Sequence, residues 1–269
     1  MLISYFNLSI AKIGKLLGLS LNNICIGNVS IELNSCNSTN IFAKNLIAKS
    51  EPIEGTVIIT DKQTNGKGQI GNTWQSEEGK NLTFSIILNP TFLKIEDQFM
   101  LSKIVSLACV ETFEYFTSKK FKIKWPNDIY IENNKIGGIL IENMLSNGKI
   151  ATSILGVGLN INQEHFLNLP RAVSLKNVKY HNYNLISVLE VLLKKLDVYY
   201  LKLRKGKINE INNLYLDKML GFEQERIFNE KGNLFKAIVK GVNKQGQLIL
   251  ELENGYQQVF SFKEISWHF

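Results

Sequence analysis

The chain has 269 residues, of which 45% are hydrophobic, enough for one large and one small domain that each bury a core. Its 31 basic and 24 acidic residues are spread along the chain without a run of five or six like charges, which argues against a nucleic-acid-binding protein. No apolar run approaches the roughly 20 residues of a membrane span, and three cysteines without ligand or disulfide spacing fit a reducing, cytoplasmic setting.

Residues 1–27 carry an apolar stripe with loosely helical spacing, interrupted by lysines and glycines. We expect a short N-terminal extension or a capping helix. A winged helix-turn-helix domain needs more chain than this, so we expect no binding to DNA.

From Asn28 the pattern changes to an alternation of strands and helices. Residues 29–33 alternate like a half-buried strand, and residues 41–47 have the apolar spacing of a helix. Ser38 and Thr39 precede this helix, where a hydroxyl commonly caps the first turn. A helix N-terminus also offers hydrogen bonds to a ligand, so both roles stay open for these two residues.

A loop rich in glycine and lysine follows a strand over residues 56–60. It contains Gly66, Lys67, Gly68 and Gly71 and ends near Trp74. Glycines let backbone N–H groups approach an anion closely, and lysines add positive charge. Residues 66–71 match the dinucleotide fingerprint G-x-G-x-x-G, but that motif needs a helix behind it, and here another strand, residues 82–88, follows. We predict a loop that closes over a phosphate group in a different fold.

The rest of the chain divides into a framework and an all-β tail. We expect these further elements: a helix over 97–117, a strand over 121–131, hairpin turns at 133–134 and 146–148, a strand over 151–161, and helices over 189–203 and 208–219. Gly221 has the position of a helix stop. Beyond it, short strands over 235–239, 248–252 and 257–260 with Gln-Gly and Asn-Gly turns between them indicate a small SH3-like barrel.

With these motifs the chain resembles the biotin protein ligases, specifically the type that lacks an N-terminal DNA-binding domain. The resemblance extends over residues 29–267 and rests on five motifs in order: Ser38-Thr39-Asn40, residues 63–74, residues 124–128 (KWPND), residues 135–140 (KIGGIL) and residues 156–162 (GVGLNIN). It implies an α+β fold, with the mixed sheet and flanking helices of class II aminoacyl-tRNA synthetases and biotin ligases, plus a C-terminal SH3-like β-barrel. We expect an extension over 1–27, a catalytic domain over 28–220 and a β domain over 221–269.

The family's activity would follow. Biotin protein ligases make biotinyl-5′-AMP from biotin and Mg-ATP, and then transfer biotin to one lysine of a biotin carboxyl carrier protein, a carboxylase subunit. The attacking carboxylate is already ionised at neutral pH, so no strong general base is required. The resemblance thus implies ATP and Mg²⁺, a carrier-protein partner, no membrane and, as is common in the family, a homodimer.

The resemblance also implies roles for individual residues. Lys67, Lys135 and Asp128 are the expected catalytic residues. Asp128 is a Mg²⁺ ligand, a group that orients lysine, or a structural carboxylate at the end of a strand. Biotin contacts are implied for Ser38, Thr39, Asn40, Gln63, Gly66, Lys67, Lys135 and Gly138. Nucleotide contacts are implied for Gly66, Lys67, Gly68, Gln69, Asn72, Trp74, Asn127, Lys135 and Asn160, with Trp74 stacking on adenine. No residue is assigned as a metal ligand with certainty.

The glycine loop departs from the family pattern. The family usually has arginines where this chain has Lys67, Gln69, Ile70 and Asn72. Lysine lacks the two-pronged fork with which arginine grips an anion, and glutamine has no charge. We therefore expect the adenylate to be held less firmly.

Other functions remain open at this stage. Lipoate ligases and octanoyl transferases share the fold, and some of the latter use a cysteine nucleophile. We interpret Cys36 instead as a small apolar filler, because no histidine lies near it in sequence. A non-catalytic biotin-binding module and a nucleic-acid-binding regulator are the alternatives outside this superfamily.

Overall fold

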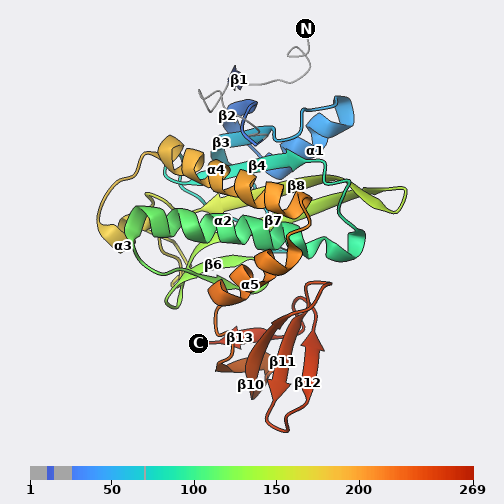
Figure 1. The fold of residues 1–269 in the computed structure, drawn as a ribbon. Coiled ribbons are helices and arrows are strands. Elements are labelled where there is room, and N and C mark those ends of the chain that lie inside the picture. Colours follow the sequence, from blue (N-terminus) through green and yellow to red (C-terminus); the bar gives the residue numbers. More distant parts are fainter. Residues whose placement is uncertain (1–10, 15–25, 70) are drawn as a thin grey trace.

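The computed structural model describes residues 11–14, 26–69 and 71–269, which form a large sheet covered by helices and a small C-terminal sheet (Figure 1). The strands of the large sheet are β1 (Ala11–Gly14), β2 (Ser30–Cys36), β3 (Val57–Gln63), β4 (Leu82–Leu88), β5 (Lys122–Lys124), β6 (Asp128–Ile131), β7 (Asn134–Ser146) and β8 (Lys149–Leu159). Their order is β1-β2-β3-β4-β8-β7-β6-β5. Only the pair β2 and β3 is parallel among the described pairings of this sheet, which confirms the mixed α+β fold.

Helices cover both faces of the sheet. Helix α1 (Thr39–Lys49) connects the parallel strands β2 and β3. The other face carries α2 (Phe99–Thr117), which follows the short 3-10 turn η2 (Ile95–Asp97), together with α4 (Leu185–Arg204) and α5 (Ile208–Lys218). The short α3 (Leu175–Lys179) follows β8 in the sequence. No helix in the described part of the chain combines the length and apolar character needed to cross a bilayer.

The alternation of side chains along the strands explains the two layers of core. In β4, Ile86 and Leu88 belong to the main core cluster with α2, whereas Ile87 between them packs in a second cluster that contains Ala43 of α1. Successive strand residues point to opposite faces, so a strand that is buried along its whole length must be covered on both. All seven residues of β4 are buried, in agreement with its position at the centre of the sheet.

The C-terminal sheet contains β9 (Glu225–Glu230), β10 (Asn233–Val242), β11 (Leu248–Leu252), β12 (Gln257–Phe260) and β13 (Ser266–His268) in the antiparallel order β12-β11-β10-β9-β13. This arrangement confirms the small SH3-like domain. It is docked on the large domain through Trp125, whose indole N–H donates to the Gly246 carbonyl at 2.8 Å. Phe262 packs its ring against Trp125, with 5.4 Å between the centroids.

Two sequence expectations about local structure are wrong. Residues 121–131 form a hairpin, β5 and β6, whose turn includes the cis peptide between Trp125 and Pro126. Proline cannot donate a ladder hydrogen bond, so one continuous strand is disfavoured there. Residues 11–14 are not part of a helix. They form a strand, because they pair with β2 at the edge of the sheet. The remainder of the expected capping helix lies outside the described residues, apart from Ile26 and Gly27, which lie in a turn.

The end of α5 also differs from the expectation. The helix stops at Lys218, and its cap residue Met219 is extended. Gly221, with φ of 72°, lies two residues further on, in the turn that leads into the C-terminal domain. Its left-handed conformation therefore serves the link between the domains, where the Leu220 N–H donates to the Ile123 carbonyl at 2.8 Å.

Candidate active site between the glycine loop and the C-terminal domain

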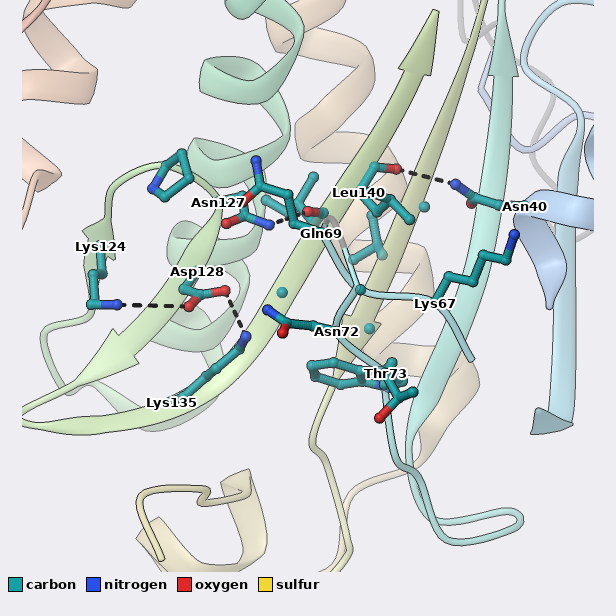
Figure 2. A pocket seen from close by; sticks show the side chains of 18 of the residues that line it. Asn40, Lys67, Gln69, Asn72, Thr73, Lys124, Asn127, Asp128, Lys135 and Leu140 are labelled. Atoms are coloured by element: carbon teal, nitrogen blue, oxygen red, sulfur yellow. Dashed lines mark hydrogen bonds and ion pairs between the residues drawn. The ribbon is translucent and has the colours of Figure 1, made fainter. Parts of the chain in front are cut away.

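A cavity of about 340 Å³ lies on the large sheet, under the glycine loop and beside the C-terminal domain (Figure 2). Side chains from segments far apart in sequence meet in it. Among the residues expected at the site, the following line this cavity: Ser38, Thr39, Asn40, Gln63, Lys67, Gly68, Gln69, Asn72, Trp74, Asn127, Asp128, Lys135 and Gly138. Two expected residues, Gly66 and Asn160, are not part of its lining.

One end of the cavity is formed by uncharged polar groups at the start of α1. Ser38, Thr39 and Asn40 are each only 3% exposed. The Thr39 backbone N–H donates to Gln63 Oε1 at 2.9 Å, and the Ser85 hydroxyl donates to Thr39 Oγ1 at 2.7 Å. Ser38 occupies the N-cap position without making a side-chain capping bond. A hydroxyl not used for capping can hydrogen-bond a neutral polar ligand in this end of the cavity.

The Asn40 amide is held in a fixed orientation. Its Nδ2 donates to Glu142 Oε2 at 2.8 Å and to the Leu140 carbonyl at 3.3 Å. A Cβ at Gly156 would lie 2.3 Å from Asn40 Oδ1, so this position has no room for a side chain. Gly156 was not assigned to the site from the sequence, although it begins the GVGLNIN motif that could have indicated it.

The opposite end of the cavity carries charge (Figure 2). Lys135 Nζ lies 2.6 Å from Asp128 Oδ1, and Lys124 Nζ lies 4.0 Å from Asp128 Oδ2. Burial lowers the pKa of Lys124, and Lys135 and Arg171 act in the same direction against the opposing charge of Asp128. Asp128 therefore contacts two lysines and orients them. No group of three or more His, Cys, Asp or Glu side chains in the described chain could hold a metal ion.

The glycine loop forms a small hairpin above the cavity. The Trp74 N–H donates to the Gly66 carbonyl at 2.9 Å, and the Gly68 N–H donates to the Asn72 carbonyl at 2.8 Å. A Cβ on Gly66 would lie 2.4 Å from the Trp74 carbonyl oxygen. Gly66 is thus needed for the close approach of two backbone segments, which in turn positions Lys67 over the cavity.

Trp74 lies between this cavity and a second one. Its indole rests on the facing glycines of β7 and β8, because a Cβ on Gly158 would be 2.4 Å from Trp74 Cε2 and one on Gly138 would be 3.3 Å from Trp74 Cζ3. The second cavity, of about 330 Å³, is lined by Trp74, Lys135, Asn160 and apolar side chains of residues 166–172. Trp74 and Lys135 therefore contribute to both cavities.

Asn160 belongs to the second cavity. Its Nδ2 donates to the Val173 carbonyl at 3.1 Å, whereas its buried Oδ1 has no hydrogen-bond partner in the described chain. Arg171 and Ala172 line the second cavity, and their segment is fixed to the backbone of Lys135. The Lys135 N–H donates to the Arg171 carbonyl at 2.7 Å, and the Val173 N–H donates to the Lys135 carbonyl at 2.9 Å. A buried acceptor without a partner is costly, so a donor on a bound ligand is expected there.

Several lining residues were not found from the sequence. Lys124 belongs to a recognised motif but had no role assigned. Arg171 and the segment 263–267 of the C-terminal domain come from regions without a motif, and only the folded chain brings them to the cavities. Cys36, in contrast, behaves as expected: it packs in the second core cluster, and burial raises the pKa of its thiol, so it is not an activated nucleophile.

Comparison with known proteins agrees with this geometry. The family model for the biotin/lipoate A/B protein ligase family matches residues 33–160. The fold is that of a biotin protein ligase from Aquifex aeolicus solved with biotin and ATP, with a TM-score of 0.74, 28% identity and coverage of 89% of this chain and 98% of that one. The chain is therefore similar to the biotin/lipoate A/B protein ligase family in its fold and in the sequence of residues 33–160.

Curated relatives of this family include proteins with one and with two activities. The bifunctional ligase/repressor BirA of Bacillus spizizenii is 28% identical over 220 residues, which cover 80% of this chain and 67% of the relative. The biotin--[acetyl-CoA-carboxylase] ligase of Mycobacterium tuberculosis is 24% identical over 220 residues, 80% of each chain. The family model ends at residue 160, whereas the structural match covers 89% of the chain.

Proposed function

We propose that this protein activates biotin with ATP to form biotinyl-5′-AMP and then transfers biotin to a specific lysine of a biotin carboxyl carrier protein. The observation that carries the proposal is a pair of adjoining cavities, sharing Trp74 and Lys135, that together offer three different environments. An uncharged polar end suits a neutral ring, a group of lysines suits a carboxylate and phosphates, and an adjoining apolar cavity with Trp74 and Asn160 suits a purine.

Biotin would enter with its ureido ring at the start of α1. That ring carries both N–H donors and a carbonyl acceptor but no charge, matching Ser38, Thr39, Asn40 and Gln63 in kind. The apolar side chain of biotin would then cross the sheet over Gly138 and Gly156, and its carboxylate would reach Lys135 and Lys67. Adenine would stack on Trp74 and donate its amino group to the unpartnered Oδ1 of Asn160.

The first step needs positioning and charge rather than a base. A carboxylate oxygen of biotin attacks the α-phosphorus of ATP, and the bond to the pyrophosphate oxygen breaks on the opposite side. Lys135, oriented by Asp128, would stabilise the charge that develops on the α-phosphate, with Lys67 and the loop N–H groups above it. Mg²⁺ would arrive with ATP as part of the substrate.

The second step releases AMP. The amine of the carrier lysine attacks the carbonyl carbon of the mixed anhydride, an amide forms, and AMP leaves with the bonding electrons. The mixed anhydride is reactive toward water, so a cavity covered by the loop would limit hydrolysis. Transfer to a carrier protein is supported by the similarity to the biotin--[acetyl-CoA-carboxylase] ligase of Mycobacterium tuberculosis.

The test is a coupled assay on the purified protein. Biotin and Mg-ATP together should give pyrophosphate and biotinyl-5′-AMP, and a carrier domain added afterwards should gain biotin at one lysine, measured by intact mass. Pyrophosphate release that does not depend on biotin, or a carrier that stays unmodified, would contradict the proposal.

A lipoate ligase or octanoyl transferase fits the site less well. Lipoate and octanoate end in apolar groups, which would cover the buried Ser38 hydroxyl, a group that makes no capping bond, without offering it a hydrogen bond. A cysteine-dependent transferase is disfavoured because Cys36 does not line the cavity. Running the exchange assay with biotin, lipoate and octanoate in parallel separates these activities.

We extend the proposal to the setting of the enzyme. It acts in the cytoplasm, where free thiols such as Cys36 and Cys109 persist, and it binds no operator DNA. Self-association would use an edge of the large sheet other than that of β5, because the backbone at Met219 and Leu220 covers β5. Sedimentation with and without biotinyl-5′-AMP measures this, and a monomer under both conditions would exclude a homodimer.

A further inference from the structure

Five charged residues from both domains line the main cavity, and their net charge is positive. Among the described lining residues, lysines 67, 124, 135 and 263 face a single carboxylate, that of Asp128. Biotinyl-5′-AMP carries only one phosphate, whereas ATP brings two more phosphates that must leave as pyrophosphate. The excess of positive charge therefore fits the triphosphate better than the adenylate.

The direction in which pyrophosphate leaves follows from the reaction. In an in-line displacement the attacking and leaving oxygens lie on opposite sides of the phosphorus. If biotin occupies the end near Asn40, the leaving group points to the end that holds Lys124 and Asp128, and Figure 2 shows these groups on opposite sides of the cavity. Residues 263 and 265–267 of the C-terminal domain also line the cavity.

Lys263 is presented by a turn that is firmly attached to the large domain. The Glu264 N–H donates to the Ser261 carbonyl at 3.2 Å, and the Ser261 N–H donates to Glu264 Oε2 at 2.7 Å. Between them, Phe262 packs on Trp125, the residue next to Lys124. Docking of Phe262 on this motif thus brings the following lysine into the lining of the cavity.

The backbone of Lys263 is unusual. Its φ is 68°, in the left-handed region that glycine adopts without strain and a lysine does not. A strained conformation at a ligand cavity is a reason to look for a role of the side chain. The same conformation makes glycine a substitution that removes the side chain without disturbing the turn.

We propose that Lys263 binds the β- and γ-phosphates of ATP and the departing pyrophosphate, so that the C-terminal domain contributes a catalytic cation to adenylation. This inference rests on the proposed ligase function. It assigns to the C-terminal domain a part in the first step only, because no pyrophosphate is present when biotin is transferred to the carrier.

The test compares Lys263→Gly with a matched control, Lys231→Gly. Lys231 is also a non-glycine residue with positive φ, at 50°, in an exposed turn of the same domain, and it does not line the cavity. Both variants are measured in the full-length protein for biotin-dependent exchange of labelled pyrophosphate into ATP, for inhibition by pyrophosphate, and for transfer from supplied biotinyl-5′-AMP to a carrier domain.

We expect Lys263→Gly to lower kcat/KM for ATP about tenfold, a smaller effect than the loss of a fully buried oxyanion donor. Inhibition by pyrophosphate should weaken similarly, transfer from supplied adenylate should be unchanged, and Lys263→Arg should retain activity. Lys231→Gly should match the wild type in all three assays. Thermal melting of both variants confirms that they fold.

Three results would overturn the inference. Exchange and pyrophosphate inhibition at wild-type levels in Lys263→Gly would remove its role. A loss confined to transfer from supplied adenylate would assign Lys263 to docking of the carrier instead. Absence of biotin-dependent exchange in the wild type would reject the proposed function itself, and the inference with it.

Discussion

Replacing Lys135 by alanine tests the centre of the proposed site. Lys135 Nζ lies 2.6 Å from Asp128 Oδ1, lines both cavities, and would contact the α-phosphate during adenylation. Loss of one preorganised group of this kind costs about 3 to 4 kcal/mol of transition-state stabilisation, or roughly a hundredfold to a thousandfold in rate. We expect biotin-dependent exchange of pyrophosphate to fall by that factor.

The same substitution should cost much less in stability. The Lys135 side chain is 34% exposed, so its ion pair is partly screened, and Asp128 keeps Lys124 at 4.0 Å. We expect a loss of about 1 kcal/mol, or a fall of roughly 2 to 4 °C in Tm for a chain of this size. Lys236→Ala is the control, because the Lys236 and Glu225 side chains, 3.2 Å apart, are 54% and 57% exposed, and Lys236 is absent from the main cavity. Near-normal exchange in a folded Lys135→Ala protein would refute the assignment of the catalytic centre.

Three further predictions concern packing, retention and pH. Gly158→Ala would place a Cβ 2.4 Å from the Trp74 indole, so we expect a higher KM for ATP with little change in biotin affinity; an unchanged KM would contradict adenine stacking on Trp74. Gln69→Arg should slow release of biotinyl-5′-AMP, since arginine adds a charged fork above the cavity, and equal release rates would count against the leaky loop. Burial lowers the pKa of Lys103 to about 8, below its value in the unfolded chain. The free-energy cost of burying the charged amine is therefore fully present below pH 8 and is relieved as the pH rises toward 10. Relative to Lys103→Met, the free energy of unfolding of the wild type should therefore rise by about 2 to 3 kcal/mol over that pH range. The cation–π contact between the charged amine and Tyr215 makes this gain smaller. Parallel pH profiles of the two proteins would exclude the prediction.

The class of fold and most of the site could be predicted from the sequence, because they depend on short motifs of neighbouring residues. Motifs such as Ser38-Thr39-Asn40 and residues 124–128 occur where strands and helices begin or end, and their chemistry is carried by neighbouring residues. The strand over 82–88 was correct to the residue, since a mostly apolar run of this length between turn signals is typical of a strand covered on both faces. Errors arose where pairing decided the conformation, as for residues 11–14, which are a strand because β2 supplies their partner.

The sequence by itself determined which chemical groups the protein has. These are uncharged hydrogen-bonding side chains, a glycine loop with lysines, and the side chains of Trp74 and Asn160. Only the tertiary structure decided how they divide between two cavities, with Asn160 and Trp74 beside the second and Lys135 at the boundary. It also decided that Arg171 and Lys263 join them. Neither lies in a local motif, and their positions depend on long-range contacts, the backbone bonds to Lys135 and the packing of Phe262 on Trp125, that no short segment can specify.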